Sequence, residues 1–201
     1  MVVTLIEKQG RYKYKIFLDY SYVFWLTWKE LYFWGVKENK EISNEQYNKI
    51  LKEAIIPKAK RKAISYLEKS SRTEKEIRDK LKRELYEEEI IESVIKYLDG
   101  YHYLNDDWVA ENFVRANQFR HSRKWMEMKL AQKGIDKERL HIFFEEEYSE
   151  KLAIQKEIEK KLKGRKQITW EEKNKIMASL YRKGYSISDT RKVMEQIEIE
   201  G

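Results

Sequence analysis

The chain has 201 residues, of which 41% are hydrophobic and 38% charged, and its formal net charge is +7. So large a charged fraction favours an elongated protein whose helices each bury one face, because a compact sphere of this length would need more aliphatic residues. The absence of cysteine excludes disulfides and thiolate metal sites. Without a signal-peptide core or an apolar run of membrane length, we expect a cytoplasmic protein with no membrane contact.

The first part of the chain has the pattern of a small β-ribbon. Residues 11–18 alternate polar and apolar side chains, which is typical of a half-buried strand. We expect residues 2–6 to pair with it across a turn at Gln9 and Gly10, and residues 20–26 are a candidate for a third strand.

Two helices are predicted to follow the ribbon. The capping box at residues 27–30 begins a short helix that stops at Gly35. A second capping box at residues 43–46 begins a helix that runs toward Ile56. Pro57 then either breaks this helix or opens the next one.

From Lys58 onward the whole chain is predicted to be helical, and it carries an internal repeat with a period of about 50 residues. Leu81, Leu130 and Leu180 are the equivalent anchors. Around them, matching residues recur at helical spacing. The matching sets are Ile77, Met126 and Ile176; Leu85, Gly134 and Gly184; Tyr86, Ile135 and Tyr185; Val94, Phe143 and Val193; Ile95, Phe144 and Met194; and, more weakly, Ile91, Leu140 and Thr190.

Each copy of the repeat is predicted to contain three helices. Their expected ranges are 60–68, 73–83 and 87–98; 106–118, 122–133 and 136–146; and 150–162, 169–183 and 188–197. Gly134 and Gly184 stand where a helix needs a left-handed residue to end. We therefore expect a mainly α fold of three tandem three-helix repeats in an elongated curved arrangement, preceded by a small N-terminal β-ribbon and helix region. The expected divisions are 1–57, 58–104, 105–149 and 150–201.

The sequence offers no constellation for catalysis or for a cofactor. It contains neither a phosphate-binding Gly-x-x-x-x-Gly-Lys loop nor a dinucleotide fingerprint. His102, His121 and His141 are too far apart for a typical metal site, so a surface or packing role is favoured. Asp106 and Asp107 are interpreted as a helix N-cap and a first-turn acid. We expect no enzyme activity, no metal and no cofactor.

Basic clusters are the better candidates for a binding surface. Exposed lysines and arginines can contact phosphates or acidic protein patches, whereas the alternative is a solvated helix face with acidic neighbours one turn away. The third cluster is the strongest, with five cations and no acid in seven residues. The clusters are Lys58, Lys60, Arg61 and Lys62; Arg115, Arg120, Arg123 and Lys124; Lys160, Lys161, Lys163, Arg165 and Lys166; and the pair Arg182 and Lys183.

Aromatic residues crowd the N-terminal ribbon. With Arg11, Lys13 and Lys15 between them, they suggest a platform on which nucleic-acid bases stack. A small ribbon, however, needs large side chains for its own core, so packing is favoured. Trp108, Trp125 and Trp170 are likewise expected to pack. The ribbon aromatics are Tyr12, Tyr14, Tyr20, Tyr22, Phe24, Trp25, Trp28, Tyr32, Phe33 and Trp34.

Three segments of the helical part resemble the RecX regulatory family. Residues 103–110, Tyr-Leu-Asn-Asp-Asp-Trp-Val-Ala, resemble the family's Gly-Tyr-Leu-Asp-Asp-x-x-Phe-Ala segment. Residues 129–135 resemble its Leu-x-x-Lys-Gly-Ile stretch, and residues 72–81 its Arg-Ser-x-x-Glu-Leu-x-x-Lys-Leu stretch. The resemblance covers about residues 59–198. The departures are Asn105 for the first acid, Trp108 and Val109 for the x-Phe pair, and Leu85 for a glycine.

The resemblance implies a non-enzymatic regulator that binds the RecA recombinase filament on DNA and inhibits its ATPase, strand exchange and coprotease activity. Its partner would be the RecA filament, with single- or double-stranded DNA as a candidate second partner. The modest charge excess, apart from the resemblance, favours a monomer. The runner-up is a stand-alone helical nucleic-acid-binding protein that acts through its basic faces.

Overall fold

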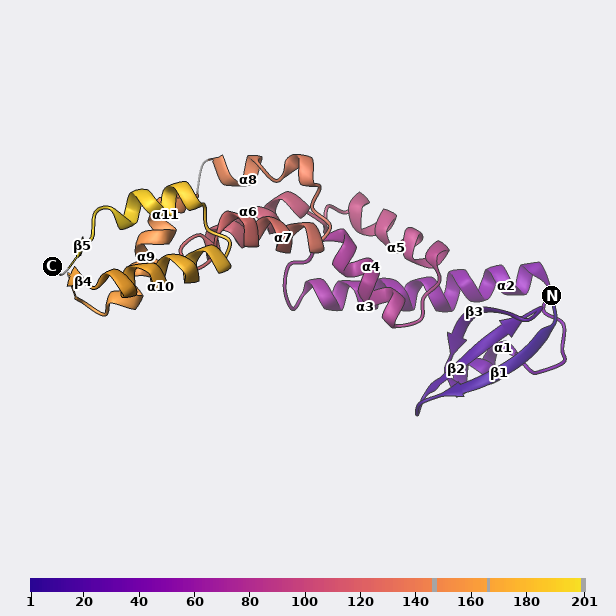
Figure 1. Ribbon diagram of the computed structural model, residues 1–201. Helices are drawn as coiled ribbons and strands as arrows, with labels where there is room; N and C mark the ends of the chain where they lie inside the picture. Colours follow the sequence, from indigo (N-terminus) through magenta and orange to yellow (C-terminus); the bar gives the residue numbers. More distant parts are fainter. Residues whose placement is uncertain (146–147, 166, 200–201) are drawn as a thin grey trace. The chain divides into compact units, whose positions relative to one another are not determined.

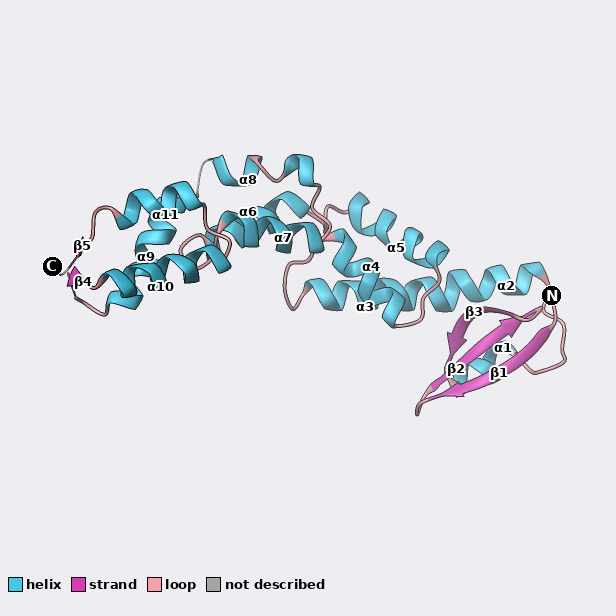
Figure 2. Cartoon of the chain, in the orientation of Figure 1, coloured by secondary structure: helices cyan, strands magenta, loops and turns pink. Residues whose placement is uncertain are grey.

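A computed structural model of the chain describes residues 1–145, 148–165 and 167–199, and its residues group into two units, Met1–Leu104 and Asn105–Gly201 (Figure 1). Both units are mainly helical, and strands are concentrated at the start of the first unit (Figure 2). The mainly α fold with a small N-terminal ribbon is therefore confirmed.

The first unit begins with a three-stranded antiparallel meander. Strands β1 (Val3–Gln9), β2 (Lys13–Leu18) and β3 (Ser21–Leu26) follow one another in the sheet in chain order. Ile16 of the central strand pairs with Ile6 on one side and Phe24 on the other. All three expected strands are present, and the buried alternate residues of β2 explain the period-two pattern.

The helices that follow differ from expectation at one cap. Helix α1 (Trp28–Trp34) has the full capping box and ends at left-handed Gly35, as predicted. Helix α2 (Asn44–Ile50) is capped by the Ser43 side chain, but the prediction of a second capping box is wrong. The side-chain amide of Gln46 instead donates a hydrogen bond of 2.8 Å to the carbonyl of Trp34, which connects α2 to α1.

Pro57 does not break the helix, and it is the second residue of α3 (Ile56–Leu67), one position after the start that the second alternative assigned to it. Helix α2 continues through a π-helical turn at Leu51–Ile55 into α3. In this turn the N–H of Ile56 donates to the carbonyl of Leu51, five residues earlier. Pro57 lies in the first turn of α3, where its missing N–H costs little.

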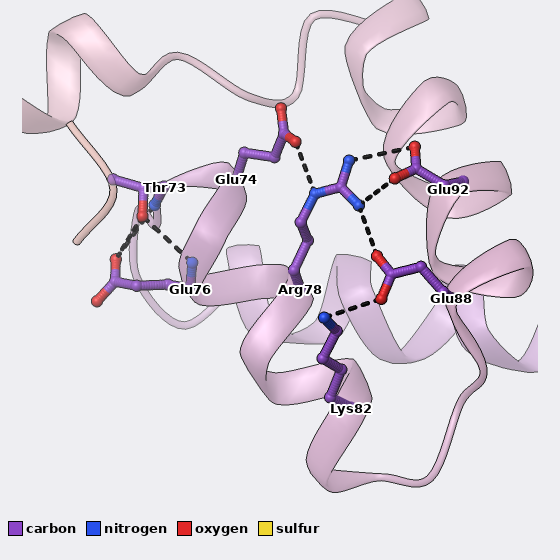
Figure 3. Close-up of polar contacts among 7 residues, drawn as sticks. All are labelled: Thr73, Glu74, Glu76, Arg78, Lys82, Glu88 and Glu92. Carbon is purple, nitrogen blue, oxygen red and sulfur yellow. Dashed lines mark hydrogen bonds and ion pairs between the residues drawn. The ribbon is translucent and has the colours of Figure 1, made fainter. Parts of the chain in front are cut away.

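The first three-helix module consists of α3, α4 (Glu74–Arg83) and α5 (Glu88–Gly100), and it shares one hydrophobic core with the ribbon. Arg78 on α4 is the centre of a group of ion pairs in this module (Figure 3). Its guanidinium contacts Glu74 at 2.7 Å, Glu92 at 2.5 Å and Glu88 at 3.3 Å. Because two of these acids belong to α5, the arginine links the two helices.

The second unit contains two further modules. The first comprises α6 (Asp106–Asn117), α7 (Arg123–Gln132), a 3-10 turn at Lys137–Arg139 and α8 (Ile142–Glu145). The second comprises α9 (Glu150–Leu162), α10 (Trp170–Arg182) and α11 (Ile187–Met194). Each has its own core, and Tyr148 packs against both cores. We propose that the divisions 58–104, 105–149 and 150–201 are the repeat units.

Four details of the second unit correct the sequence-based expectation. The helix expected at 136–146 is split, because the side chain of Asp136 caps the N–H of Glu138 and starts a 3-10 turn. Its expected end at Glu146 lies outside the described residues. The helix expected to reach Ile197 ends at Met194. The region expected to be wholly helical also contains a two-stranded parallel sheet of β4 (Gln167–Ile168) and β5 (Glu198–Ile199). Asn105, not Asp106, is the N-cap of α6, and both aspartates stand in its first turn.

The repeat is visible in the backbone as well as in the sequence. The anchors Leu81, Leu130 and Leu180 are all fully buried. In each copy the N–H five residues after the anchor donates to the anchor's carbonyl, and the residue before that donor is left-handed. Thr190, the weak match, is also fully buried, so this position belongs to the core in all three copies.

Candidate partner and nucleic-acid interface

The first basic cluster is used inside the first unit. Lys58 lies 2.8 Å from a carboxylate oxygen of Glu30 and 4.1 Å from the ring centre of Trp25. Lys62 lies 2.9 Å from Glu84, and Lys60 is 4.0 Å above the ring of Tyr97. Three of its four cations therefore stabilise contacts within the unit. The fourth, Arg61, is exposed.

Glu84 is the centre of a clasp between the ribbon and the first module, which the sequence did not reveal. Its carboxylate contacts Lys13 at 2.7 Å, Lys62 at 2.9 Å and the hydroxyl of Tyr66 at 3.1 Å. The hydrogen bond from Lys13 is the main cause that lowers the pKa of Glu84 to about 2. The backbone carbonyl of Glu84 also accepts a hydrogen bond of 2.9 Å from the Trp25 indole.

The clasp explains how leucine replaces glycine at position 85. Leu85 has a left-handed φ of 67°, and its glycine counterparts Gly134 and Gly184 are left-handed too, at 95° and 85°. The hydroxyl of Tyr22 donates to its carbonyl at 2.5 Å, and its half-buried side chain packs against the core of the unit. Ribbon contacts thus hold a turn that leucine would otherwise disfavour.

The second and third basic clusters meet at the junction of the two modules in the second unit. The hydroxyl of Ser122, the N-cap of α7, donates a hydrogen bond of 2.7 Å to the carbonyl of Lys183 at the end of α10. Between these elements lies Glu157 of α9, which is only 6% exposed. It is paired with Lys160 at 3.0 Å and with the ammonium group of Lys183.

Glu157 is held in its ionised form at the junction. Burial alone would raise its pKa, but hydrogen bonds from Lys183 and Lys160 outweigh burial and lower it. A buried carboxylate thus holds two lysines of different helices beside each other. Burial also lowers the pKa of nearby His121, whose ring stacks on Trp125 at a centroid distance of 3.6 Å.

Further cations surround this junction. Arg120 and Lys124 are exposed and form no ion pair with any residue that the structure describes. A side chain at Gly184 would touch Lys124, which places Lys124 beside the end of α10. Lys156 lies 3.8 Å from the ring centre of Phe119, next to Arg120 in the chain. We call the exposed group Arg120, Lys124, Lys156, Lys160 and Lys183 the junction surface.

Other predicted site residues do not join this surface. Arg123 pairs with Glu127 at 2.7 Å, and Arg165 pairs with Glu172 at 2.9 Å. The third cluster has no acid within its own seven residues, but Glu172 reaches Arg165 from the following helix. Lys161 is half-buried, and Lys163 is the left-handed cap of α9. Arg115 and Arg182 are exposed in the last turns of α6 and α10. Lys166 lies outside the described residues.

Sequence reasoning missed two members of the junction. Lys156 was overlooked because it stands outside the dense run that begins at Lys160. Glu157 was overlooked because one acid on a charged helix has no distinguishing pattern. The useful signal was its place among the apolar residues Ala153, Ile154 and Ile158, which form the buried face of α9.

The aromatic residues divide between core and surface. Phe24 and Trp25 are buried, as the packing interpretation predicts. That interpretation is wrong for Tyr12, Tyr20, Trp28, Tyr32 and Phe33, which are exposed, and for Trp108 and Trp170, which are also exposed. Trp125 packs against the core of its module.

The described residues hold neither a candidate membrane span nor a candidate metal site. Across residues 1–145, 148–165 and 167–199, no helix combines the length and apolar character needed to cross a membrane. In the same part of the chain, no three acidic or histidine side chains gather closely enough to hold a metal ion.

Comparison with known proteins identifies similar modules. The model of the first three-helix domain of RecX matches residues 59–98, and the model of its third three-helix domain matches residues 152–194. The regulatory protein RecX of Caldanaerobacter subterraneus subsp. tengcongensis is 28% identical over 195 residues, which are 96% of this chain and 98% of the relative. That of Bacillus velezensis is 31% identical over 202 residues, which are 96% of this chain and 76% of the relative.

Solved structures show the same similarity. A crystal structure of regulatory protein RecX aligns with a TM-score of 0.64 and 25% identity, and the alignment covers 96% of this chain and 98% of that one. The crystal structure of RecX from Lactobacillus salivarius aligns with a TM-score of 0.59 and 27% identity over 70% of this chain and 95% of that one.

Proposed function

The chain belongs to the RecX family of regulatory proteins, and from this membership we propose that it binds the RecA filament on DNA and inhibits the ATPase, strand exchange and coprotease activity of RecA. The observation that carries the proposal is the convergence of basic side chains on the junction between two family modules. We propose that the chain does this as a cytoplasmic monomer, by binding alone and without enzyme chemistry of its own.

The junction surface suits a partner that presents negative charge. Its five cations come from three parts of the second unit, and Glu157 is the buried acid that organises two of them. Cations arranged in this way can contact acidic protein surface and DNA phosphate together. Because Ser122 hydrogen-bonds to Lys183 across the junction, the two modules present these groups from a fixed frame.

Inhibition follows if one chain bridges neighbouring RecA subunits. A ligand shifts a conformational equilibrium by as much as its affinities for the two states differ. A regulator that spans two subunits in one relative position stabilises that position and opposes the motions that ATP turnover requires. In this proposal the modules lie in the filament groove and the junction surface supplies part of the contact.

The test is the ATPase activity of RecA on single-stranded DNA, titrated with the full chain at two salt concentrations. We expect inhibition at substoichiometric chain, and we expect it to persist at the higher salt because specific protein contacts supplement the phosphate contacts. Unchanged ATPase activity at excess chain would contradict the proposal. Inhibition that disappears with salt in parallel with binding to bare DNA would favour the runner-up, a stand-alone nucleic-acid-binding protein.

A further inference from the structure

The ribbon carries an exposed aromatic surface that the proposed regulation of RecA does not use. Of the seven residues of α1, only Leu31 is buried, whereas Trp28 is 66% exposed and Tyr32 is 83% exposed. Tyr12, in the turn between β1 and β2, is 65% exposed. Isolated exposed apolar residues are ordinary, but a contiguous group of large rings marks a binding surface.

These rings border two adjoining hollows. The first, of about 370 Å³, lies between Tyr12 and Trp28 and has Arg11 and Lys29 at its rim. The second, of about 450 Å³, lies between Trp28 and Tyr32, with Leu31 and Val36 as its apolar floor and Lys37 at its edge. Tyr14 and Trp28 line both hollows. We call Tyr12, Tyr14, Trp28 and Tyr32 the aromatic face.

The helix sets the spacing of two of these rings. Trp28 and Tyr32 are separated by four residues on α1, so their side chains stand on the same side of the helix, with Cβ atoms about 6 Å apart. Both rings border the second hollow. Trp28 therefore separates the two hollows, each of which can accept a flat ligand.

The charges at the rim indicate what kind of ligand fits. Arg11, Lys29 and Lys37 form no ion pair with any residue in the described part of the chain, and Arg11 contacts only the ring of Tyr12, at 5.1 Å. The one acid that lines the hollows, Glu38, already accepts a hydrogen bond of 2.7 Å from the N–H of Ile6. The surface thus offers flat rings together with three cations and one carboxylate, which leave a net positive charge.

We propose that the aromatic face binds single-stranded DNA, with successive bases stacked on either side of Trp28 and with Arg11, Lys29 and Lys37 at the phosphates. Every base has a π-face, so such a surface binds without strong sequence preference. A duplex keeps its bases stacked inside and presents only its backbone to this surface. An apolar peptide would gain nothing from the three cations. The choice of DNA over RNA rests on the proposed function, which places the chain on DNA.

The test is binding of the full chain to a fluorescent oligothymidylate of about 12 nucleotides, a length within the range that small single-strand-binding surfaces cover. RecA is absent, so failure here is distinct from failure of the proposed regulation. The variant Trp28→Leu keeps an apolar side chain and removes the flat ring. Phe33→Leu is the matched control, because Phe33 is 76% exposed on the same helix and lines neither hollow.

We expect Trp28→Leu to weaken binding by about tenfold, from the loss of base stacking, and Phe33→Leu to leave binding unchanged. Lys29→Gln together with Lys37→Gln should lower the dependence of binding on salt by about one ion per lysine removed. Circular dichroism of each variant establishes that it is folded. Equal binding by Trp28→Leu and the parent chain would overturn the proposal. So would an equal weakening of duplex binding by Trp28→Leu, or binding of oligouridylate but not of oligothymidylate.

Discussion

At the scale of single residues, the three repeats end their middle helix with the same backbone conformation but with different residue types. Each middle helix ends with a left-handed residue, at Leu85, Gly134 and Gly184. Glycine adopts this conformation without a steric penalty, whereas other residues lose about 1–2 kcal/mol. At Leu85 the penalty is offset by the hydrogen bond from Tyr22 and by core packing. At Gly184 a side chain would also press on the neighbouring module.

Gly184→Ala is therefore expected to destabilise the second unit more than a left-handed alanine alone would. A Cβ at this position would lie 3.1 Å from the hydroxyl of Ser122, which caps α7 and bonds to Lys183. We expect a loss of about 2–3 kcal/mol in the free energy of unfolding, from the backbone and the weakened cap together. Gly164→Ala is the control, since Gly164 is also left-handed but has open space around it. Chemical denaturation compares the two, and equal losses would contradict the close contact.

Glu84 makes the stability of the first unit depend on pH. Its pKa is lowered from 4.5 to about 2 in the folded chain. A carboxylate with a depressed folded pKa stabilises the fold above its unfolded pKa, and this contribution disappears as the pH falls from about 4.5 toward 2. We expect Glu84→Gln to cost about 1–2 kcal/mol at neutral pH, after allowance for solvent screening, and much less near pH 3.

Urea denaturation at several pH values measures this difference. Glu68→Gln is the control, because Glu68 is exposed and forms no ion pair with any residue that the structure describes. It should change stability little at either pH. A cost of Glu84→Gln that is the same at neutral pH and at pH 3 would show that the carboxylate charge does not hold the clasp.

At the scale of elements, Arg78 links α4 to α5 through acids on both helices (Figure 3). The arginine is 23% exposed, whereas its acidic partners are 45–59% exposed, so the network is worth less than a buried one. We expect Arg78→Met, which keeps most of the aliphatic stem, to destabilise the first unit by about 1 kcal/mol. Lys96→Met on α5 should cost less, because Lys96 is exposed and forms no ion pair with any residue that the structure describes. Equal costs in thermal unfolding would contradict the link.

The elements that the sequence predicted well are those with local signals. Thr73 and Thr169 form capping boxes, and the buried apolar positions recur at helical spacing, so both middle helices were located. The prediction was wrong where a distant or subtle contact decides the structure. Gln46 bonds to α1 rather than to its own cap, and Ile168 pairs with Ile199 across the last module. Such contacts leave no periodic pattern in the sequence.

The candidate site was likewise predicted only as far as local sequence signals reach. The sequence marks Arg120, Lys124 and Lys160 as members of basic runs, but it does not bring those runs together. Their meeting depends on Ser122 reaching Lys183 and on Glu157 being buried between two lysines. The exposure of Trp28 and Tyr32 was equally hidden, since a short aromatic helix has the same composition whether it is buried or exposed.

At the scale of the whole molecule, the two candidate surfaces lie on different units. The junction surface belongs to the unit Asn105–Gly201, and the aromatic face belongs to Met1–Leu104. Their chemistry differs too, since one is a group of cations around a buried acid and the other a group of rings with cations at the rim. Substitutions in one surface therefore leave the other intact, and the two proposed activities can be separated.

The most direct test of the central claim is sedimentation of the chain with RecA filaments assembled on single-stranded DNA. The test variant combines Arg120→Gln and Lys124→Gln, which removes two exposed cations without breaking an ion pair among the described residues. The control combines Lys175→Gln and Lys192→Gln, an equal loss of charge at exposed positions on α10 and α11 that make none of the junction's contacts. We predict that the parent and the control sediment with the filament and that the test variant binds about tenfold more weakly. Equal binding of the test variant and the control, or no sedimentation of the parent chain, would contradict the account.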